Sequence, residues 1–211
     1  MSNDDPRRPH WENVYSTKAA DSVSWFQASP KMSLELIDAS GVDRSSSIID
    51  IGGGASGLVN ALLERGQRGI AVLDIAAAGL AVAKHRLGAR RDAVEWIVAD
   101  IIHWQPSRRF DLWHDRAVFH FLTSEADRRG YLAALDKGLA IGGTLILATF
   151  ALDGPERCSG LPVQRYDAAG LAAVLGPGFE LRESRSEAHH TPGGGVQNFT
   201  WARFRRVAVS R

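Results

Sequence analysis

The chain has 211 residues, 45% of them hydrophobic, which predicts a single domain with a sizeable core. Its 25 Lys and Arg are balanced by 24 Asp and Glu, so the net charge of +1 gives no reason to expect a nucleic-acid partner. No apolar run approaches the roughly 18 residues of a membrane span, and the lone cysteine, Cys158, excludes an intramolecular disulfide. We therefore expect a cytoplasmic monomer or dimer without a membrane or nucleic-acid partner.

The N-terminal segment is rich in aromatic residues, which is unusual in a disordered tail: Trp11, Tyr15, Trp25 and Phe26. One interpretation is a helix that packs against the edge of a sheet. The other is a lid whose aromatic faces cover a bound cofactor or substrate. A helix is expected from Pro30 to about Gly41. We assign residues 1–45 to this lid or helical segment and residues 46–211 to the main part of one structural domain.

A glycine turn follows the first predicted strand. Residues 47–51 are an apolar run with β-branched isoleucines, typical of a buried parallel strand, and residues 56–65 have helical periodicity. Between them lie Gly52, Gly53 and Gly54, where the absence of a Cβ lets a ligand approach the backbone closely. Asp50 comes just before this turn, at the C-terminal end of the strand.

The rest of the chain predicts an α/β sheet. Strands are expected at 69–74, 93–100, 110–114 and 144–150, and helices at 76–87, 124–139 and 167–175. Strands that alternate with helices favour a parallel sheet. The last two strands, 179–187 and 196–206, have no helix between them and pair most simply as a hairpin. We predict a Rossmann-like three-layer sandwich whose mostly parallel seven-stranded sheet ends in an antiparallel hairpin.

Three acids, Asp50, Asp74 and Asp100, end the first three predicted strands. The carboxyl ends of parallel strands meet at one edge of the sheet, where such folds bind ligands. One carboxylate can accept hydrogen bonds from the two hydroxyls of a diol, and another can accept from an exocyclic amine. The alternative for each acid is that it caps the helix that follows its strand.

An NAD-dependent oxidoreductase is one alternative. Gly52, Gly54 and Gly57 have the G-x-G-x-x-G spacing, and Asp74 lies twenty residues after Gly54. However, the carboxylate of Asp50 beside the turn would repel a pyrophosphate and attract an ammonium or sulfonium. The terminal hairpin also does not continue a doubly wound parallel sheet.

The same residues resemble the motifs of class I S-adenosylmethionine-dependent methyltransferases over nearly the full length of the chain. Asp50, Gly52 and Gly54 resemble the first motif, with Ser56 in place of the usual third glycine. The resemblance implies that Asp74 binds both ribose hydroxyls with Ile75 beside the adenine, and that Asp100, followed by Ile101, accepts from the adenine amino group. It implies further donor contacts from Gly53 in the glycine turn and from Trp11, Tyr15 and Trp25 in the N-terminal segment.

Trp11, Tyr15 and Trp25 resemble the N-terminal aromatic segment of a small subgroup, which includes thiopurine-type, tellurite-resistance and protein-lysine methyltransferases. His114-Asp115-Arg116-Ala117 resembles the fourth-strand motif, and this segment is expected to face the methyl group. Asp115 is the first candidate for contacting the substrate or acting as a general base; the alternative is that it caps a short helix. His114 and His120 are further catalytic candidates, although His120 lies in an apolar run typical of a packed core histidine.

The candidate substrate-binding residues are Arg116, Arg157 and Tyr166. Arg116 would bind an anionic substrate or pair with Asp115, and the other two lie in or near the loop after the fifth strand, which also carries Cys158. His189 and His190 are interpreted as an exposed hairpin loop, and we expect no metal site.

These features predict an enzyme that uses S-adenosyl-L-methionine, yields S-adenosyl-L-homocysteine and needs no metal. Without an inserted domain, the pocket favours a small acceptor with a thiol, amine or carboxylate. A protein lysine is the alternative acceptor. A non-catalytic nucleotide-binding module is the alternative of another class.

Overall fold

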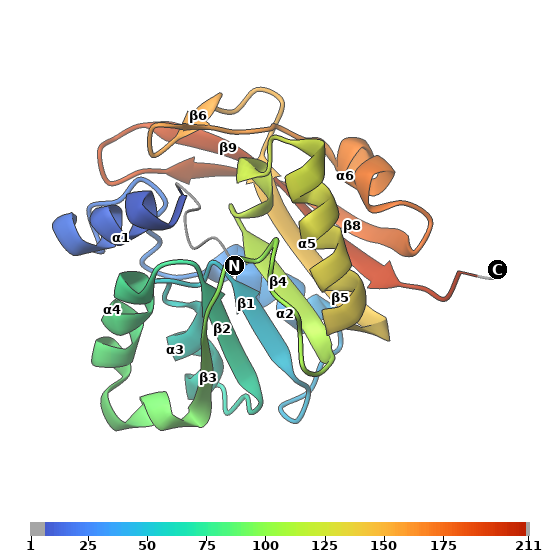
Figure 1. Ribbon diagram of the computed structural model, residues 1–211, viewed down its shortest axis with the longest axis horizontal. Helices are drawn as coiled ribbons and strands as arrows, with labels where there is room; N and C mark the ends of the chain where they lie inside the picture. The colour runs from blue at the N-terminus through green and yellow to red at the C-terminus, as the bar shows by residue number, and fades with distance from the viewer. Residues whose placement is uncertain (1–6, 210–211) are drawn as a thin grey trace.

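A computed structural model describes residues 7–209, which contain a seven-stranded sheet in the order β3-β2-β1-β4-β5-β9-β8 (Figure 1). β1 to β5 run parallel to one another. β9 pairs antiparallel with β5 on one side and with β8 on the other. The strands are β1 Ile48–Ile51, β2 Ile70–Asp74, β3 Val94–Val98, β4 Phe110–Arg116, β5 Leu139–Phe150, β8 Phe179–His190 and β9 Val196–Arg206. The predicted Rossmann-like fold with a terminal hairpin is confirmed.

The chain reverses its direction across the sheet next to β1. From β1 it proceeds to β2 and β3, and it then returns to place β4 on the other side of β1. Open α/β sheets bind ligands at this switch point, outside the carboxyl ends of the strands. Residues 99–109, which connect β3 to β4, contain no helix.

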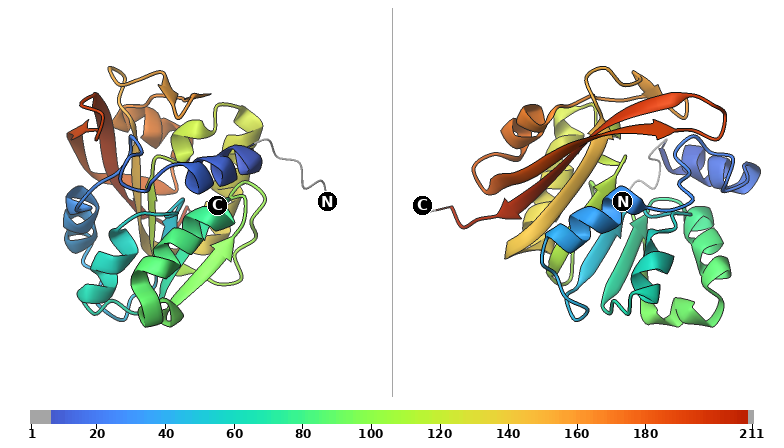
Figure 2. Two further views of the ribbon diagram at one scale, coloured as in Figure 1. Left: turned by 90° about the vertical axis from the view of Figure 1, so that its left-hand side faces the viewer. Right: turned by 180° about the vertical axis from the view of Figure 1, so that it is seen from behind.

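Helices cover both faces of the sheet. α5 (Glu125–Gly138) and α6 (Ala168–Leu175) cover the face turned to the viewer in Figure 1. α2 (Lys31–Ala39), α3 (Leu58–Glu64) and α4 (Ala77–Leu87) pack on the opposite face, which the right panel of Figure 2 shows. The short elements are η1 Gly88–Ala93, η2 Phe119–Phe121, β6 Arg157–Cys158 and β7 Leu161–Pro162.

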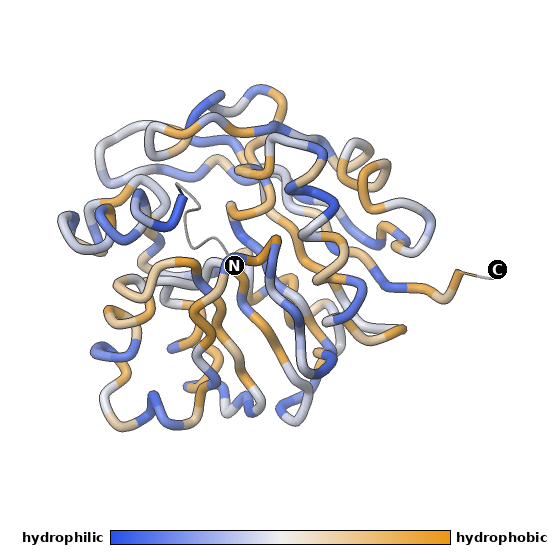
Figure 3. The backbone as a smooth tube through the Cα atoms, viewed as in Figure 1, coloured by the Kyte–Doolittle hydropathy of each residue, from blue (hydrophilic) through white to orange (hydrophobic). Residues whose placement is uncertain are grey.

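Two apolar clusters, one on each face, form the core. Alternation along β1 sends Ile48 into the cluster beside α2 and α3, and Ile49 and Ile51 into the cluster beside α5. The central strands are accordingly apolar along much of their length (Figure 3). In contrast, β8 alternates exposed and half-exposed residues, as an edge strand does.

Several boundaries differ from those predicted. β3 ends at Val98, so Asp100 lies in the following loop rather than in the strand. β5 begins at Leu139, five residues before the predicted start, and β6 with β7 forms a small hairpin inside a predicted loop. β8 extends to His190, and its His189 is buried with Nε2 bonded to the Ser24 carbonyl at 2.8 Å. The prediction of an exposed loop at His189 was therefore wrong.

α1 (Arg7–Thr17) packs against α4 rather than along the outer edge of the sheet. Glu12 fixes this position, because its carboxylate accepts hydrogen bonds from the backbone N–H groups of Ala77 (2.7 Å) and Ala78 (3.0 Å) in the first turn of α4. α4 has no side-chain cap of its own at Ala76. α1 therefore caps α4 from outside and lies over the carboxyl ends of the strands.

Candidate active site

Two adjoining cavities lie where α1 covers the carboxyl ends of the strands. The acid cavity has a volume of about 100 Å³ and is lined by Asp74 and Asp100 among others. The glycine-turn cavity has a volume of about 420 Å³ and is lined by Asp50 and the turn at Gly52 and Gly53. The residues that line both cavities, and so form the wall between them, are Tyr15, Trp25, Ile51, Gly52 and Arg116.

The structure brings together most residues predicted to hold the donor. The acid cavity is lined by the predicted residues Trp11, Tyr15, Trp25, Gly52, Asp74, Ile75, Asp100 and Ile101. Asp50 and Gly53 lie apart from these, on the glycine-turn cavity. Gly54 lines neither cavity, but a Cβ there would lie 2.5 Å from the Tyr15 hydroxyl and 2.8 Å from Oδ2 of Asp74. Its φ of +36° also requires glycine.

Asp74 ends β2 as a buried carboxylate. Oδ1 accepts a hydrogen bond from the Ala76 N–H at 2.8 Å. Burial raises the pKa of Asp74 to about 7; the negative charges of Asp50 and Glu12 also raise it, whereas the Ala76 and Gly54 N–H groups lower it. Hydroxyl donors from a ligand would stabilise the ionised form of this carboxylate.

Asp100 lies beyond β3, where its carboxylate accepts from the backbone of its own loop. The Ile102 N–H donates to Oδ1 at 3.2 Å. Arg7 of α1 lies 3.4 Å from Oδ2, and so does Nδ1 of His103. Asp100 therefore joins α1 to the loop after β3 at the rim of the acid cavity.

Asp50 and His114 are partners across β1 and β4, and their side chains form a buried hydrogen-bonded chain with Ser33 of α2. Nδ1 of His114 lies 2.7 Å from Oδ1 of Asp50, and Nε2 lies 3.0 Å from the Ser33 hydroxyl. A carboxylate only accepts, so Nδ1 donates to Asp50, while the Ser33 hydroxyl is the partner of Nε2. His114 thus orients Asp50 and lines the glycine-turn cavity.

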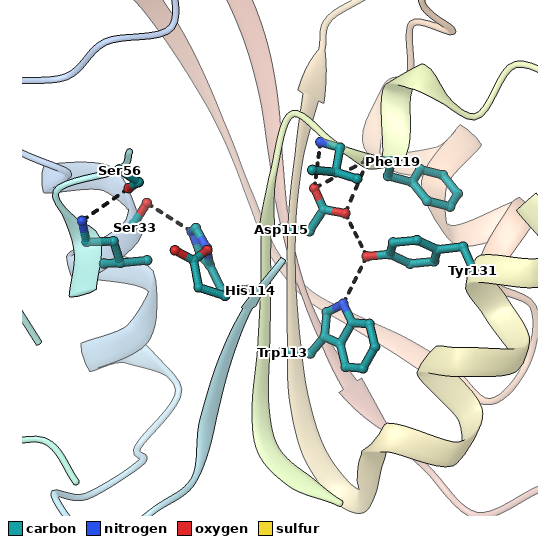
Figure 4. Close-up of polar contacts among 10 residues, drawn as sticks. Ser33, Ser56, Trp113, His114, Asp115, Phe119 and Tyr131 are labelled. Atoms are coloured by element: carbon teal, nitrogen blue, oxygen red, sulfur yellow. Dashed lines mark hydrogen bonds and ion pairs between the residues drawn. The ribbon is translucent and has the colours of Figure 1, made fainter. Parts of the chain in front are cut away.

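Asp115 points the opposite way from its neighbour His114 (Figure 4). Its fully buried carboxylate accepts from the N–H groups of Val118 (2.9 Å) and Phe119 (3.2 Å) and from the Tyr131 hydroxyl (2.7 Å). Tyr131 in turn accepts from Trp113 at 2.9 Å. Asp115 lines neither cavity. Asp115 therefore caps the short helix η2, as in the alternative given above, and its side chain is too deeply buried to contact a substrate.

Three more catalytic or substrate candidates also lie outside the cavities. His120 is fully buried among Phe121 and Phe150, outside both cavities, and burial, reinforced by Arg116, lowers its pKa to about 3. Arg157 is exposed and donates to the Gly160 carbonyl. Tyr166 packs against Phe119 beneath α5 and α6. None of these three lines a cavity.

Arg116, at the end of β4, does line both cavities. Nη1 donates to the Trp25 carbonyl at 3.0 Å, which ties the segment after α1 to the sheet. Its guanidinium also lies over the ring of Phe199, 4.8 Å from the centroid. Of the residues predicted to bind substrate, Arg116 is the one that the structure places at the site.

An aromatic wall closes the acid cavity. The Trp11 ring makes edge contacts with Trp25 at 5.6 Å and with Phe121 at 5.2 Å, and Tyr15 meets Trp25 at 6.3 Å. Phe121 and the neighbouring Val118 were not predicted, although they follow the fourth-strand motif directly. Glu12 was also missed, because nothing in its sequence context indicates a partner 65 residues away.

No group of three or more His, Cys, Asp or Glu within residues 7–209 is placed to hold a metal ion. None of the helices in that range is long and apolar enough to cross a membrane. Cys158 lines the acid cavity and is free, and burial raises its pKa to about 12, so its thiol stays protonated at neutral pH.

A family model described as a methyltransferase domain matches residues 49–145. No curated protein matches the chain. Among solved structures, 1,6-didemethyltoxoflavin-N1-methyltransferase of Burkholderia thailandensis, determined with 1,6-didemethyltoxoflavin and S-adenosylhomocysteine, is 20% identical. It matches with a TM-score of 0.71 over 99% of this chain and 93% of that chain.

Two further structures are similar over most of their lengths. N-methyltransferase NodS of Bradyrhizobium japonicum WM9, in complex with S-adenosyl-l-homocysteine, is 19% identical with a TM-score of 0.69 over 92% of this chain and 97% of that chain. A protein from work on the conversion of a disulfide bond into a thioacetal group during echinomycin biosynthesis is 18% identical. It has a TM-score of 0.76 over 96% of this chain and 94% of that chain. These likenesses show the fold.

Proposed function

We propose that this chain is a class I S-adenosylmethionine-dependent methyltransferase; the methyltransferase-domain family model that matches residues 49–145 and the Rossmann-like fold support this proposal. The proposed reaction moves a methyl group to a small-molecule acceptor. The observation that carries the proposal is the convergence of Asp74, Asp100 and the glycine turn on cavities beneath an aromatic wall.

The residues present fit such a donor. Asp74 lines the acid cavity beside Gly54, where the absence of a Cβ leaves the carboxylate uncovered, and its two oxygens suit a pair of ribose hydroxyls. Asp100, Ile75 and Ile101 line the part of the acid cavity suited to an adenine. Asp50, held by His114, gives the glycine-turn cavity a carboxylate that attracts the cationic amino-acid end of the donor.

S-adenosylmethionine supplies a methyl group that is already activated by its positive sulfur. The protein therefore has to align the acceptor, exclude water and hold both partners in line. In this chain, Trp11, Trp25 and Phe121 exclude water from the acid cavity. Arg116 lines both cavities and is therefore in reach of donor and acceptor.

We further propose that residues 7–29 act as a lid. Glu12 attaches α1 to α4, and the segment after α1 is attached to Arg116 through the Trp25 carbonyl. It is also attached to β8, where Gln27 donates to Glu187 at 3.1 Å and the Ser24 carbonyl meets His189. The lid thus bridges α4 and the terminal hairpin across the mouth of the site.

Calorimetric titration tests the proposal. We expect S-adenosylmethionine and S-adenosylhomocysteine to bind and NAD not to bind. Asp74→Ala should weaken donor binding by about 1–3 kcal/mol through lost charge-assisted hydrogen bonds, whereas Asp92→Ala, at an exposed site, should leave it unchanged. Absence of donor binding at millimolar concentration would reject the enzyme, and binding of NAD instead would support the oxidoreductase.

A further inference from the structure

Arg116 has a buried edge without a partner. Nη1 is occupied by the Trp25 carbonyl, but Nε and Nη2 are buried and make no hydrogen bond. These two nitrogens form one edge of the planar guanidinium, and their two N–H groups point the same way. That edge matches the two oxygens of a single carboxylate.

No acidic side chain within residues 7–209 pairs with Arg116. The two carboxylates whose charges act on it are both engaged elsewhere. Oδ1 of Asp50 accepts from His114 at 2.7 Å. Glu187 accepts from Trp201 at 2.7 Å and from Gln27 at 3.1 Å. A buried cation without a counter-ion is costly, so its retention indicates a partner that arrives with a ligand.

Two other titratable side chains near Arg116 carry no negative charge. Cys158, on the same cavity, keeps its proton because burial raises its pKa to about 12. His120 stays neutral because burial, followed by the charge of Arg116, lowers its pKa to about 3. The two acids of the acid cavity, Asp74 and Asp100, form no ion pair with Arg116, and aromatic side chains, among them Trp25 and Phe121, line much of the remaining wall.

We propose that the Nε–Nη2 edge of Arg116 is a receptor for the carboxylate of a ligand. The inference rests on the proposed function, and it gives the carboxylate two possible carriers, a small organic-acid acceptor or the amino-acid end of the donor. Arg116 lies on the wall shared by the acid cavity and the glycine-turn cavity, so it reaches either carrier. An acceptor amine that enters as a cation is disfavoured beside this charge.

The test compares the natural protein with Arg116→Gln, Arg116→Lys and Arg129→Gln. Arg116→Lys keeps the charge but loses the planar edge. Arg129, exposed on α5 and paired with Glu125, is the matched control. For the donor arm, the affinities of S-adenosylhomocysteine and of 5′-methylthioadenosine, which has no carboxylate, are measured by calorimetry. For the acceptor arm, ligand-observed NMR measures the binding of benzoate and of neutral benzamide to protein saturated with S-adenosylhomocysteine.

If the acceptor brings the carboxylate, Arg116→Gln weakens benzoate binding on the order of tenfold or more and leaves benzamide and S-adenosylhomocysteine unchanged. If the donor brings it, Arg116→Gln weakens S-adenosylhomocysteine by a similar factor and leaves 5′-methylthioadenosine unchanged. In either case the affinity of Arg116→Lys for the carboxylate ligand lies between those of the natural protein and Arg116→Gln. The affinity of Arg129→Gln equals that of the natural protein.

Unchanged affinity of Arg116→Gln for both benzoate and S-adenosylhomocysteine overturns the inference. An equal loss of affinity for the ligands with and without a carboxylate overturns it as well. Circular dichroism and retained 5′-methylthioadenosine binding show that the variant is folded. Failure of the natural protein to bind any adenosine ligand would instead reject the proposed function, so the two failures are distinguishable.

Discussion

Two buried carboxylates, Asp74 and Asp115, have different roles because their hydrogen-bond donors differ. Asp115 receives three donors from its own protein, and burial nevertheless raises its pKa to about 6. Asp74 interacts with the backbone N–H groups of Ala76, at 2.8 Å, and of Gly54, has no side-chain donor, and lines the acid cavity. The first carboxylate is saturated by the fold, whereas the second retains capacity for a ligand.

Asp115→Ala should therefore lower stability rather than catalysis. The substitution leaves two backbone N–H groups and the Tyr131 hydroxyl without their acceptor in a fully buried position. We expect the free energy of unfolding, measured with urea, to fall by about 3 kcal/mol. Tyr131→Phe removes one of the three donors and should lower the free energy of unfolding by less than Asp115→Ala does. A catalytic Asp115 would give the opposite result, a loss of turnover at unchanged stability.

The raised pKa of Asp74 predicts that the affinity for the donor depends on pH. With a pKa of about 7, Asp74 is mostly protonated at pH 6 and mostly ionised at pH 8. The groups that face it are Asp50 from β1 and Glu12 and Tyr15 from α1. Ribose hydroxyls favour the ionised form, so S-adenosylhomocysteine affinity should rise about tenfold from pH 6 to pH 8.

The matched variant for this experiment is Asp74→Asn. It cannot ionise, so calorimetry across the same pH range should give a flatter profile than for the natural protein. Equal slopes in the two proteins would show that another group controls the pH dependence.

At the scale of elements, Glu12 joins α1 to α4. Glu12→Ala removes an acceptor for two N–H groups in the first turn of α4 and a negative charge from the positive end of that helix. We expect a stability loss of about 1 kcal/mol and faster amide hydrogen exchange in both α1 and the first turn of α4. Glu64→Ala, at an exposed position in α3, should leave exchange in both helices unchanged.

The strands that carry the acids were predictable because an aspartate lies at or near the carboxyl end of each apolar run. Asp50 is next to the last residue of β1, Asp74 is the last residue of β2, and Asp100 lies two residues past β3. What the sequence could not resolve was the face of β4. Successive strand residues point to opposite faces, so His114 and Arg116 share one face and Asp115 the other. The choice between faces depends on which helix layer lies over each of them, and that is a tertiary property.

The loop after β5 was unpredictable for a similar reason. Its path depends on the β6–β7 hairpin, which turns Cys158 into the acid cavity and Arg157 outward. Both residues lie in a Gly- and Pro-rich stretch without periodicity. No local pattern there distinguishes an inward from an outward side chain.

At the scale of the whole molecule, the two cavities are complementary but separate. An acid cavity of about 100 Å³ is smaller than the roughly 300 Å³ at which small-molecule sites begin, whereas the glycine-turn cavity of about 420 Å³ exceeds it. A donor whose adenine lies near Asp100 and whose amino-acid end lies near Asp50 has to occupy both. We propose that Tyr15 or Trp25, which line both cavities, moves when the donor binds.

This separation predicts that lid movement limits the rate of donor association. The Tyr15 ring lines both cavities, and its hydroxyl lies beside Gly54 and Asp74. The substitution Tyr15→Ala removes this ring and should connect the two cavities. We expect stopped-flow tryptophan fluorescence to show S-adenosylhomocysteine associating several-fold faster with Tyr15→Ala than with the natural protein. Dissociation should also be faster, since the wall that covers the ligand is lost. Tyr15→Phe keeps the ring and should keep the natural rate; association rates equal in all three proteins would contradict a gating role for the lid.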